Sequence, residues 1–393
     1  MIKTIRDFNI ENKRVLIRCD FNVPIKDGKI VDDNRIVASL DTIKYAIEKR
    51  AKIVLFSHLG RVKDKSDLEK NDLSIVADRL SELLGKKVLF INVTSGSVLE
   101  NAINNMKHGD IILVQNTRYE DLDGKKESSN DKELGAYWAG LGDIFINDAF
   151  GTIHRAHASN VGIASNLESG IGFLVEKELR ALRELDNPEK PYVVILGGAK
   201  VSDKIGVIDN LVTKADYILI GGGMAFTFLK SLGYEIGKSL LDEEKIDYCS
   251  EILKKYSNKI ILPVDVVTSL NTEDTANINV KDISNILSYE VGLDIGPKTV
   301  SLFANYLKNA SVVVWNGPLG YYEINEYKKG TLELLRFLAK NNIKTIIGGG
   351  DTAAVVSSDI YLKSKIYHVS TGGGATLEYL EGKKLPGLEV LDK

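Results

Sequence analysis

Cysteine is scarce in this chain of 393 residues. The two cysteines, Cys19 and Cys249, stand far apart and have no CxxC spacing. A disulfide framework and a structural zinc site are therefore both excluded, and a reducing compartment fits. The N-terminal stretch carries Arg6, Asp7 and Glu11 where a signal peptide needs an apolar segment, and no uncharged apolar run approaches about 18 residues. We therefore expect a cytoplasmic protein that does not span a membrane.

The chain also lacks an excess of charge of either sign. It has 51 Lys and Arg against 54 Asp and Glu, a formal net charge of −3, with 44% hydrophobic and 27% charged residues. This composition is ordinary for a globular protein, and it argues against disorder and against a dedicated nucleic-acid surface. At roughly 150 residues per domain, the length predicts two or three domains.

Several catalytic signatures are absent. The sequence has no GxSxG elbow and no paired Cys and His signature, so acyl-enzyme chemistry has no candidate nucleophile. His154 and His157 have a three-residue spacing, but no nearby Cys or acidic partner completes a zinc pattern. A Walker A loop is missing, because Leu232 stands where the glycine upstream of Gly237-Lys238-Ser239 belongs. A bound nucleotide must be held in another way.

Short runs rich in Val and Ile recur along the chain, separated by longer charged stretches with helical spacing. The runs begin at residues 14, 52, 87, 110 and 143 in the first half, and at residues 192, 217, 259, 311, 344 and 366 in the second. Unbroken apolar runs are typical of parallel strands covered on both faces. A charged amphipathic stretch from Leu174, ended by Asn187 and Pro188, predicts a connecting helix. The predicted fold class is α/β, with two doubly wound parallel-sheet (Rossmann-like) domains joined by an interdomain helix and a cleft between them.

The strands of the second half end in glycine clusters. The clusters are Gly197-Gly198, Gly221 to Gly223, Gly348 to Gly350 and Gly372 to Gly374. In an open parallel sheet, ligands bind at the carboxyl ends of the strands, where glycine lets the backbone approach a phosphate and exposes helix N-terminal amides. One such cluster is explained by tight packing, but four in one half favour a nucleotide site.

The strand ends of the first half carry charged and polar side chains instead. They are Arg18, Asp20 and Asn22 after the first run, His58 and Arg61 after the second, Arg118 after the fourth, and His154 and Arg155 after the fifth, with Arg35 in the segment that opens the first helix. Guanidinium groups bind phosphate and carboxylate in a bidentate manner. Arginines converging at one sheet edge predict a small ligand with several negative charges.

Two lysines in GGAKVSDK follow a strand of the second half, and Lys200 and Lys204 lie one helical turn apart. Two cations over a glycine-lined phosphate site suit phosphoryl transfer, which needs charge neutralisation and alignment. In GGGDTAA, Asp351 and Thr352 stand at a helix start, where Asp351 could hold Mg²⁺ beside nucleotide phosphates.

Two alternatives stay open at this point. Gly348, Gly350 and Ala353 have the GxGxxA spacing of a dinucleotide site, which favours an NAD-dependent dehydrogenase, but no acidic residue follows about 20 positions later at the strand end. The second alternative is a non-catalytic nucleotide-binding protein that has kept its clefts without turnover.

Eight motifs together identify a family resemblance. They are RCDFNVP from Arg18, SHLGR from Ser57, NDAFGTIHRAHAS from Asn147, GGAKVSDK from Gly197, GGGMAFTFL from Gly221, WNGPLGYYE from Trp315, GGGDTAA from Gly348 and STGGGATLE from Ser370. In this order, and over essentially the whole chain, the sequence closely resembles the phosphoglycerate kinases. The resemblance implies a monomeric two-domain enzyme that moves a phosphoryl group between 1,3-bisphosphoglycerate and ADP, giving 3-phosphoglycerate and ATP with Mg²⁺.

The resemblance also implies the roles of individual residues. The acid would be bound by Asp20, Phe21, Asn22, Arg35, His58, Leu59, Gly60, Arg61, Arg118 and Arg155. The nucleotide would be bound by Gly198, Lys200, Lys204, Gly221, Gly222, Gly223, Gly292, Asn316, Glu323, Gly349, Gly350, Asp351 and Thr352, with Asp351 serving the metal. Arg35, Lys200 and Lys204 would be the catalytic residues, and in-line transfer would follow closure of the two domains.

The implied domains are an acid-binding domain at 1–172, a linker at 173–190, a nucleotide-binding domain at 191–374 and a segment at 375–393 that returns to the first domain. Departures from the family pattern are few. Cys19 stands where valine is common, Gln115 where glutamate is usual, and Ile153 where a smaller residue is typical. Of these, Gln115 is expected to affect the orientation of Arg118.

Overall fold

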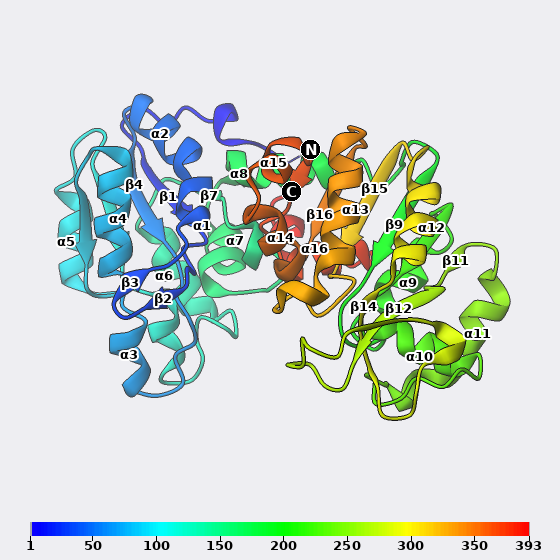
Figure 1. Cartoon of the computed structure of the whole chain (residues 1–393). Helices are drawn as coiled ribbons and strands as arrows, with labels where there is room; N and C mark the ends of the chain where they lie inside the picture. Colours follow the sequence, from blue (N-terminus) through cyan, green and yellow to red (C-terminus); the bar gives the residue numbers. More distant parts are fainter. Residues whose placement is uncertain (1, 393) are drawn as a thin grey trace. The chain divides into compact units, whose positions relative to one another are not determined.

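The computed structural model describes residues 2–392, and the chain divides into two compact units (Figure 1). The first unit consists of residues 1–180 and 384–393, and the second of residues 181–383. The division falls inside helix α8 (Phe173–Arg183), in the region predicted to connect the domains. The helix ends before the predicted stop at Asn187, because Leu185 N and Asp186 N bond to carbonyls three residues back and form a turn.

The first unit is built on a sheet of six parallel strands. The strands are β1 (Arg14–Arg18), β4 (Lys52–Phe56), β5 (Val88–Ile91), β6 (Ile111–Val114), β7 (Ile144–Asn147) and β8 (Ser169–Ile171), in the spatial order β5-β6-β4-β1-β7-β8. In the central register, Ile17 pairs with Leu55 on one side and Ile146 on the other. Five of these strands are the predicted runs. The sixth, β8, escaped prediction because it is a three-residue strand with Gly170 at its centre.

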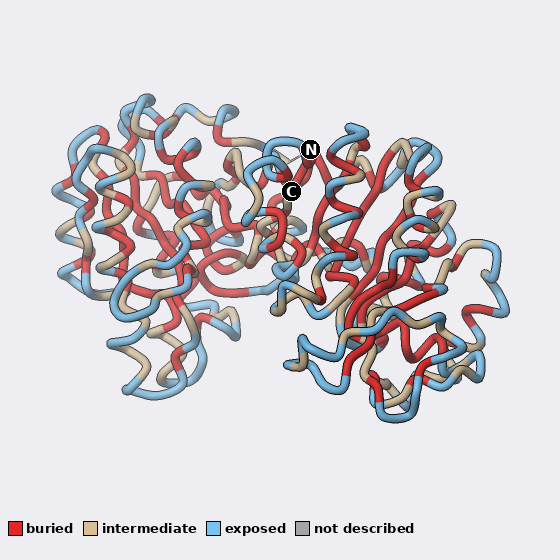
Figure 2. Tube along the Cα trace, in the orientation of Figure 1, coloured by how far each residue is buried: buried red, intermediate tan, exposed pale blue. Residues whose placement is uncertain are grey.

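The first unit also contains helices. They are α1 (Asn34–Ala38), α2 (Leu40–Glu48), α3 (Ser66–Lys70), α4 (Ser74–Leu84), α5 (Ser97–Asn104), α6 (Lys132–Gly140), α7 (Ile163–Asn166) and α17 (Pro386–Glu389). Figure 2 shows long buried stretches in both units, and the central strands β1, β4, β6 and β7 are buried almost throughout, whereas the edge strand β5 exposes Leu89. Burial of consecutive strand residues means that both faces of the sheet are covered, as the unbroken apolar runs predicted.

The second unit repeats this plan. Its strands are β9 (Tyr192–Leu196), β10 (Tyr217–Ile220), β11 (Ile260–Ile261), β15 (Val312–Asn316), β16 (Thr345–Gly348) and β17 (His368–Val369), in the order β11-β10-β9-β15-β16-β17. Its helices are α9 (Ile205–Leu211), α10 (Met224–Ser231), α11 (Ile246–Tyr256), α12 (Pro297–Leu307), α13 (Lys329–Lys340), α14 (Gly350–Ser357), α15 (Ile360–Lys365) and α16 (Gly374–Leu380). Numbered along the chain, these strands have the 3-2-1-4-5-6 order of the Rossmann fold, whose ligands bind where the order reverses, here between β9 and β15. The prediction of two parallel-sheet α/β domains is confirmed.

A small antiparallel sheet in the second unit was not predicted. It consists of β12 (Asp265–Ser269), β13 (Asn279–Asp282) and β14 (Val291–Ile295), in the order β13-β12-β14. The predicted single strand from residue 259 is two strands, because Pro263 lies between β11 and β12 and the chain changes sheets there. A further hairpin, β2 (Ile25–Lys26) with β3 (Lys29–Ile30), turns at Asp27 and Gly28, which both have positive φ.

The last part of the chain belongs to both units in turn. Helix α16 packs against α9, and Asn210 Nδ2 donates to Leu380 O at 2.8 Å, so residues 375–383 lie with the second unit rather than with the returning segment. Residues 384–393 join the first unit, where Gly387 N donates to Ile153 O at 2.9 Å. Within residues 2–392, no helix is long and apolar enough to cross a membrane.

Candidate active site

The ends of β1 and β4 bring the predicted acid-binding side chains together in the first unit. Arg35 Nη1 donates to Asp20 Oδ2 at 2.5 Å. Asn22 N donates to Asp20 Oδ1 at 3.2 Å, and Asn22 Oδ1 accepts from Gly60 N at 2.8 Å. These bonds tie the loop after β1 to the loop after β4. They hold Asp20, Asn22 and Arg35 in one cluster.

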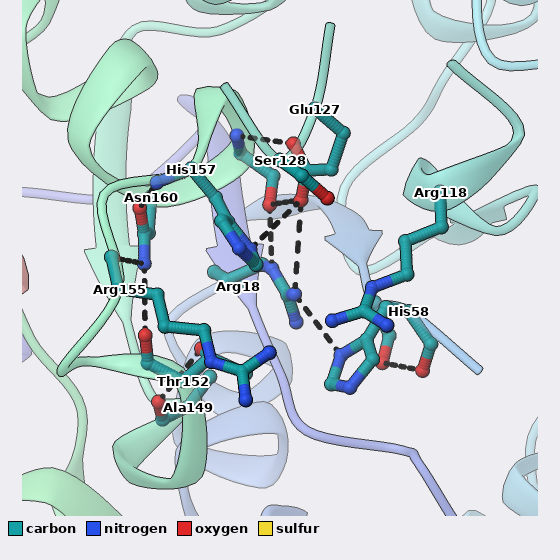
Figure 3. A network of polar contacts seen from close by, with 12 residues as sticks. Arg18, His58, Arg118, Glu127, Ser128, Ala149, Thr152, Arg155, His157 and Asn160 are labelled. Atoms are coloured by element: carbon teal, nitrogen blue, oxygen red, sulfur yellow. Dashed lines mark hydrogen bonds and ion pairs between the residues drawn. The ribbon is translucent and has the colours of Figure 1, made fainter. Parts of the chain in front are cut away.

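Arg118 carries the clearest sign of an anion site in this unit. Its side chain is nearly buried, and Nη1 donates to Gly60 O at 2.9 Å, but Nε is buried and has no partner. Burial lowers the pKa of Arg118, and the positive charges of Arg155 and Arg18 lower it further. Figure 3 shows Arg118, Arg155 and His58 converging on one region, with Arg18 beside them. A buried donor without a partner among like charges is a place where an anion would bind favourably.

Some of the residues predicted to bind the acid do not point their side chains toward the region around Arg118. Phe21 and Leu59 are buried in the core, so only their backbones could contact a ligand. Phe21 N donates to Ser57 Oγ at 2.8 Å, and Leu59 N donates to Asn116 Oδ1 at 3.2 Å. Arg61 and Arg155 are exposed. The family motif therefore contains residues that shape the loops as well as residues placed to bind.

The histidines near these arginines are held uncharged. The pKa of His157 is lowered to about 3 and that of His154 to about 4, chiefly by burial and, in addition, by the positive charge of neighbouring arginine side chains, which for His154 is Arg155 alone. Burial also lowers the pKa of His58 well below its usual value, again with help from Arg18 and Arg118. The positive charge of this cluster therefore comes from guanidinium groups, and it does not change across the neutral pH range.

The second unit contains a cavity of about 480 Å³ whose lining suits a nucleoside. The lining residues include Gly222, Gly223, Phe226, Leu240, Pro263, Val266, Gly292, Leu293, Tyr321 and Glu323. Apolar and aromatic side chains dominate it, which favours a planar base, while the exposed carboxylate of Glu323 at its margin is suited to ribose hydroxyls. Gly221, predicted with its two neighbours, bonds through its N–H to Leu196 O at 2.9 Å, in line with the parallel sheet.

A second cavity of about 400 Å³ lies at the strand ends where the sheet order reverses. Its lining includes Gly198, Lys200, Lys204, Asn316, Gly317, Gly349, Gly350, Asp351, Gly373 and Gly374. The two cavities share Gly198, Ala199, Pro318 and Asp351, so they adjoin. A nucleotide could place its base in the larger cavity and its phosphates in the smaller one.

The polar groups of the smaller cavity are suited to phosphate. Lys204 Nζ bonds Asn316 Oδ1, and burial lowers the pKa of Lys204, whereas Lys200 is exposed. Helix α14 points its N-terminal amides here from Gly349, which has φ +92°. Thr352 is buried, and its Oγ1 accepts from Gly317 N at 3.1 Å, so its hydroxyl supports the loop after β15.

Asp351 fits a magnesium ion that is shared with phosphates. No cluster of three or more His, Cys, Asp or Glu able to hold a metal occurs among the described residues. Mg²⁺ is commonly held by one or two carboxylates together with nucleotide phosphates and water, rather than by a full protein cage. The exposed Asp351 carboxylate meets this requirement, and its Oδ1 accepts from Tyr322 OH at 2.9 Å.

The second unit combines a sheet of Rossmann order with lysines and a helix N-terminus around a nucleotide-sized cavity, and the first unit carries a separate arginine cluster. Together these features define a phosphotransferase of the kinase class. A family model described as phosphoglycerate kinase matches residues 5–383. The chain belongs to the phosphoglycerate kinase family.

Relatives and solved structures agree over the whole chain. The chain is 56% identical to the phosphoglycerate kinase of Fusobacterium nucleatum over 396 residues, covering 100% of this chain and 99% of that protein. It is 56% identical over 394 residues to that of Listeria monocytogenes, with the same coverage. The structure of the Coxiella burnetii phosphoglycerate kinase matches with a TM-score of 0.89 at 41% identity, covering 100% of this chain and 99% of that one. For the Pyrococcus horikoshii enzyme the TM-score is 0.85 at 31% identity, covering 100% and 98%.

These relatives support an enzyme that transfers a phosphoryl group and uses ATP and ADP as substrates. They give no support to an NAD-dependent dehydrogenase or to a non-catalytic binding protein. Sequence reasoning missed Glu127, a fully buried carboxylate that lies 4.0 Å from the guanidinium of Arg18. No sequence signal could have found it, because Glu127 stands in a polar loop where an acidic residue is unremarkable.

Proposed function

We propose that the first unit binds 3-phosphoglycerate through its arginine cluster and that the second unit binds Mg²⁺-nucleotide in its adjoining cavities. The buried, unpartnered Nε of Arg118 is the observation that carries the assignment of the acid site. The glycine-lined cavity with Lys200, Lys204 and Asp351 supports the assignment of the nucleotide site. Asp20, Asn22, Arg35, His58, Arg61 and Arg155 complete the acid site in this proposal.

The transfer itself needs no covalent enzyme intermediate. In the direction of ATP consumption, a carboxylate oxygen of 3-phosphoglycerate attacks the γ-phosphorus, a new O–P bond forms, and the bond to the β-phosphate oxygen breaks to leave ADP. Lys200 and Arg35 stabilise the charge on the equatorial oxygens, and Lys204 holds the nucleotide phosphates. Mg²⁺ bound at Asp351 would neutralise phosphate charge. Because the two ligands are held by different units, those units must bring the reacting oxygens together and exclude water.

The experiment measures ADP formation from Mg²⁺-ATP with and without 3-phosphoglycerate. We expect turnover to depend on the acid, and we expect Lys200→Ala to lower kcat by about 10² or more, as for the loss of a preorganised charge. Arg118→Ala should raise the KM for the acid by about tenfold or more, because it removes a charged donor, and leave the KM for ATP unchanged.

Lys230→Ala is the matched control, since Lys230 is an exposed lysine at the end of α10 and lines neither cavity. It should behave as the unmodified enzyme. Acid-dependent turnover that survives Lys200→Ala with unchanged kcat would refute the role of Lys200. The fluorescence of the two tryptophans is used to check that each variant is folded.

We further propose that the protein acts as a cytoplasmic monomer. Cys19 and Cys249 are free and buried, in accord with a reducing compartment. Light scattering should give a mass near 43.3 kDa. A dimer mass would contradict this proposal without affecting the assignment of either site.

A further inference from the structure

Arg18 is a fully buried arginine at the end of β1, beside the proposed acid site. Its guanidinium donates through Nε to Ser159 Oγ at 2.8 Å and through Nη1 to Cys19 O. Its third contact joins Nη2 to His58 Nδ1 at 3.2 Å. Figure 3 shows the imidazole of His58 next to the guanidinium groups of Arg18 and Arg118. Arg18 therefore has no side-chain nitrogen left free for a ligand, because Nε, Nη1 and Nη2 each contact another group of the protein.

Glu127 and Ser159 hold this guanidinium in place. Glu127 Oε1 lies 4.0 Å from Arg18 Nη2, and both side chains are fully buried. Ser159 bridges the two, because its Oγ, which accepts from Arg18, lies 2.5 Å from Glu127 Oε1, and its N donates to Glu127 Oε2 at 2.9 Å. A buried charge is costly without a partner, so Glu127 is what allows a cation to occupy this position.

The contact with Arg18 determines which nitrogen of His58 carries the proton. A guanidinium has five N–H donors and no acceptor, and it stays protonated in proteins. Nδ1 of His58 must therefore accept the bond from Arg18, and a ring nitrogen that accepts carries no hydrogen. The proton of the neutral imidazole is then on Nε2. No partner for His58 Nε2 is found among residues 2–392, so this N–H is available to a ligand.

We propose that Arg18, anchored by Glu127 and Ser159, is a positioning residue that fixes His58 as the uncharged Nε2–H tautomer, which donates a directed hydrogen bond to the anionic acid. The inference rests on the proposed function for the role of His58 as a ligand of the acid, but the tautomer stands on the geometry of the free protein. The charged and titratable groups that face His58 are Arg18, Arg118, His157, Arg35 and, behind Arg18, Glu127. Most of them are cations, which oppose protonation of the ring. The donor should consequently stay the same from pH 6 to pH 8.

Nitrogen-15 spectra of the histidine rings test the tautomer directly. The chain has five histidines, and the signals of His58 are assigned by their loss in His58→Gln. We expect an unprotonated Nδ1 and a protonated Nε2 in the unmodified protein, with no change between pH 6 and pH 8. In Arg18→Met the Nδ1 contact is lost, so we expect the Nδ1–H tautomer to appear. Ser159→Ala, a milder change, should shift the same signals in the same direction.

Arg14→Met is the matched control, because Arg14 lies on the same strand and pairs with Asp143 at 2.8 Å, away from His58. It should leave the His58 signals unchanged. The kinetic counterpart is the KM for 3-phosphoglycerate at pH 8, where the phosphate of the acid is fully ionised. In Arg18→Met it should rise by about tenfold, with the KM for ATP unchanged, as expected for the loss of one hydrogen bond to a charged ligand.

Two outcomes separate the inference from the proposed function. A protonated Nδ1 on His58 in the unmodified protein, or a His58 spectrum that Arg18→Met and Ser159→Ala leave unaltered, would overturn the inference. If the predicted tautomer is present but His58→Gln leaves the KM for 3-phosphoglycerate unchanged, the role of His58 as a ligand in the proposed acid site is wrong.

Discussion

At the scale of single residues, Gln115 shows why an amide is needed at one buried position. Its Nε2 donates to Asp72 Oδ2 at 2.6 Å and to Asn92 Oδ1 at 2.7 Å, and its Oε1 accepts from Leu73 N and Asn116 N. All its hydrogen-bonding capacity is used, and Gln115 acts on Arg118 only through Asn116, whose Oδ1 accepts from Arg118 N at 3.0 Å. The Gln115 amide thus holds in place the loop from which Arg118 extends into the proposed acid site.

We predict that Gln115→Glu lowers the free energy of unfolding by about 2–4 kcal/mol at pH 7, because it buries a second carboxylate against Asp72 and removes two donors. Urea unfolding followed by the fluorescence of Trp138 measures the change. Adding Asp72→Asn restores a donor opposite the new carboxylate and should recover part of the loss. Full stability in the single variant would contradict this explanation.

His157 predicts a stability effect that depends on pH. Its pKa is lowered to about 3 in the folded chain, so as the pH falls below about 6.5 the unfolded chain takes up a proton that the folded chain does not. The native protein therefore loses stability at this site as the pH falls. The loss of unfolding free energy that His157→Gln causes should become smaller for the same reason. Between pH 7.5 and pH 5.0 it should shrink by about 2 kcal/mol.

Urea unfolding at the two pH values measures this difference. His108→Gln is the control, since His108 is exposed, and its effect should be the same at both. A constant cost for His157→Gln would mean that the folded chain also takes up the proton.

At the scale of elements, the turn from β10 into α10 requires glycine. Gly222 has φ +67°, and a Cβ there would lie 2.8 Å from the backbone of Gly198 and from Pro318 O, which line both cavities. We predict that Gly222→Ala costs about 2 kcal/mol or more of stability and raises the KM for ATP by about tenfold or more, because strain and a backbone clash coincide.

Gly233, just after the other end of α10, allows the effect of backbone strain to be measured without the effect of a steric clash. It has φ +91°, but a Cβ there would meet nothing within 4 Å. Gly233→Ala should cost about 1 kcal/mol and leave the KM for ATP unchanged. Equal effects of the two substitutions on ATP binding would show that the clash at Gly222 is unimportant.

The elements also show how far sequence reasoning reaches. Unbroken runs such as Val312–Asn316 predicted most of the parallel strands, because burial on both faces demands continuous apolar residues. The short strand β8 and the antiparallel β12–β14 sheet were missed, since the central glycine of β8 and the largely exposed residues of β13 weaken that signal. In the site, glycines and strand-end arginines were visible as motifs. The partnership of Arg18 with Glu127 was not, because it joins residues whose proximity only the fold creates.

At the scale of the whole molecule, the first unit is completed by residues from the far end of the chain. Leu385 and Leu391 are buried, and Gly387 N bonds Ile153 O. We predict that removing residues 384–393 lowers the stability of the first unit by about 3 kcal/mol or more, the value of burying two leucines.

The two tryptophans allow each unit to be observed alone. Trp138 lies in the first unit and Trp315 in the second, so Trp315→Phe and Trp138→Phe each leave a single reporter. The truncation should lower the urea midpoint seen by Trp138 and leave that seen by Trp315. Lys384→Ala, at an exposed position of the same segment, should change neither. A truncated chain with an unshifted Trp138 transition would contradict the prediction.

The interrupted first unit has a consequence for how the protein is made. Residues 181–383 are synthesised between the two parts of the first unit. At about 5–20 residues per second, roughly 10–40 s pass on the ribosome between the first part and the segment that completes it. The second unit emerges as one uninterrupted stretch and can fold as soon as it is made. Until residues 384–393 emerge, the surface around Ile153 that they cover in the finished protein stays exposed to solvent.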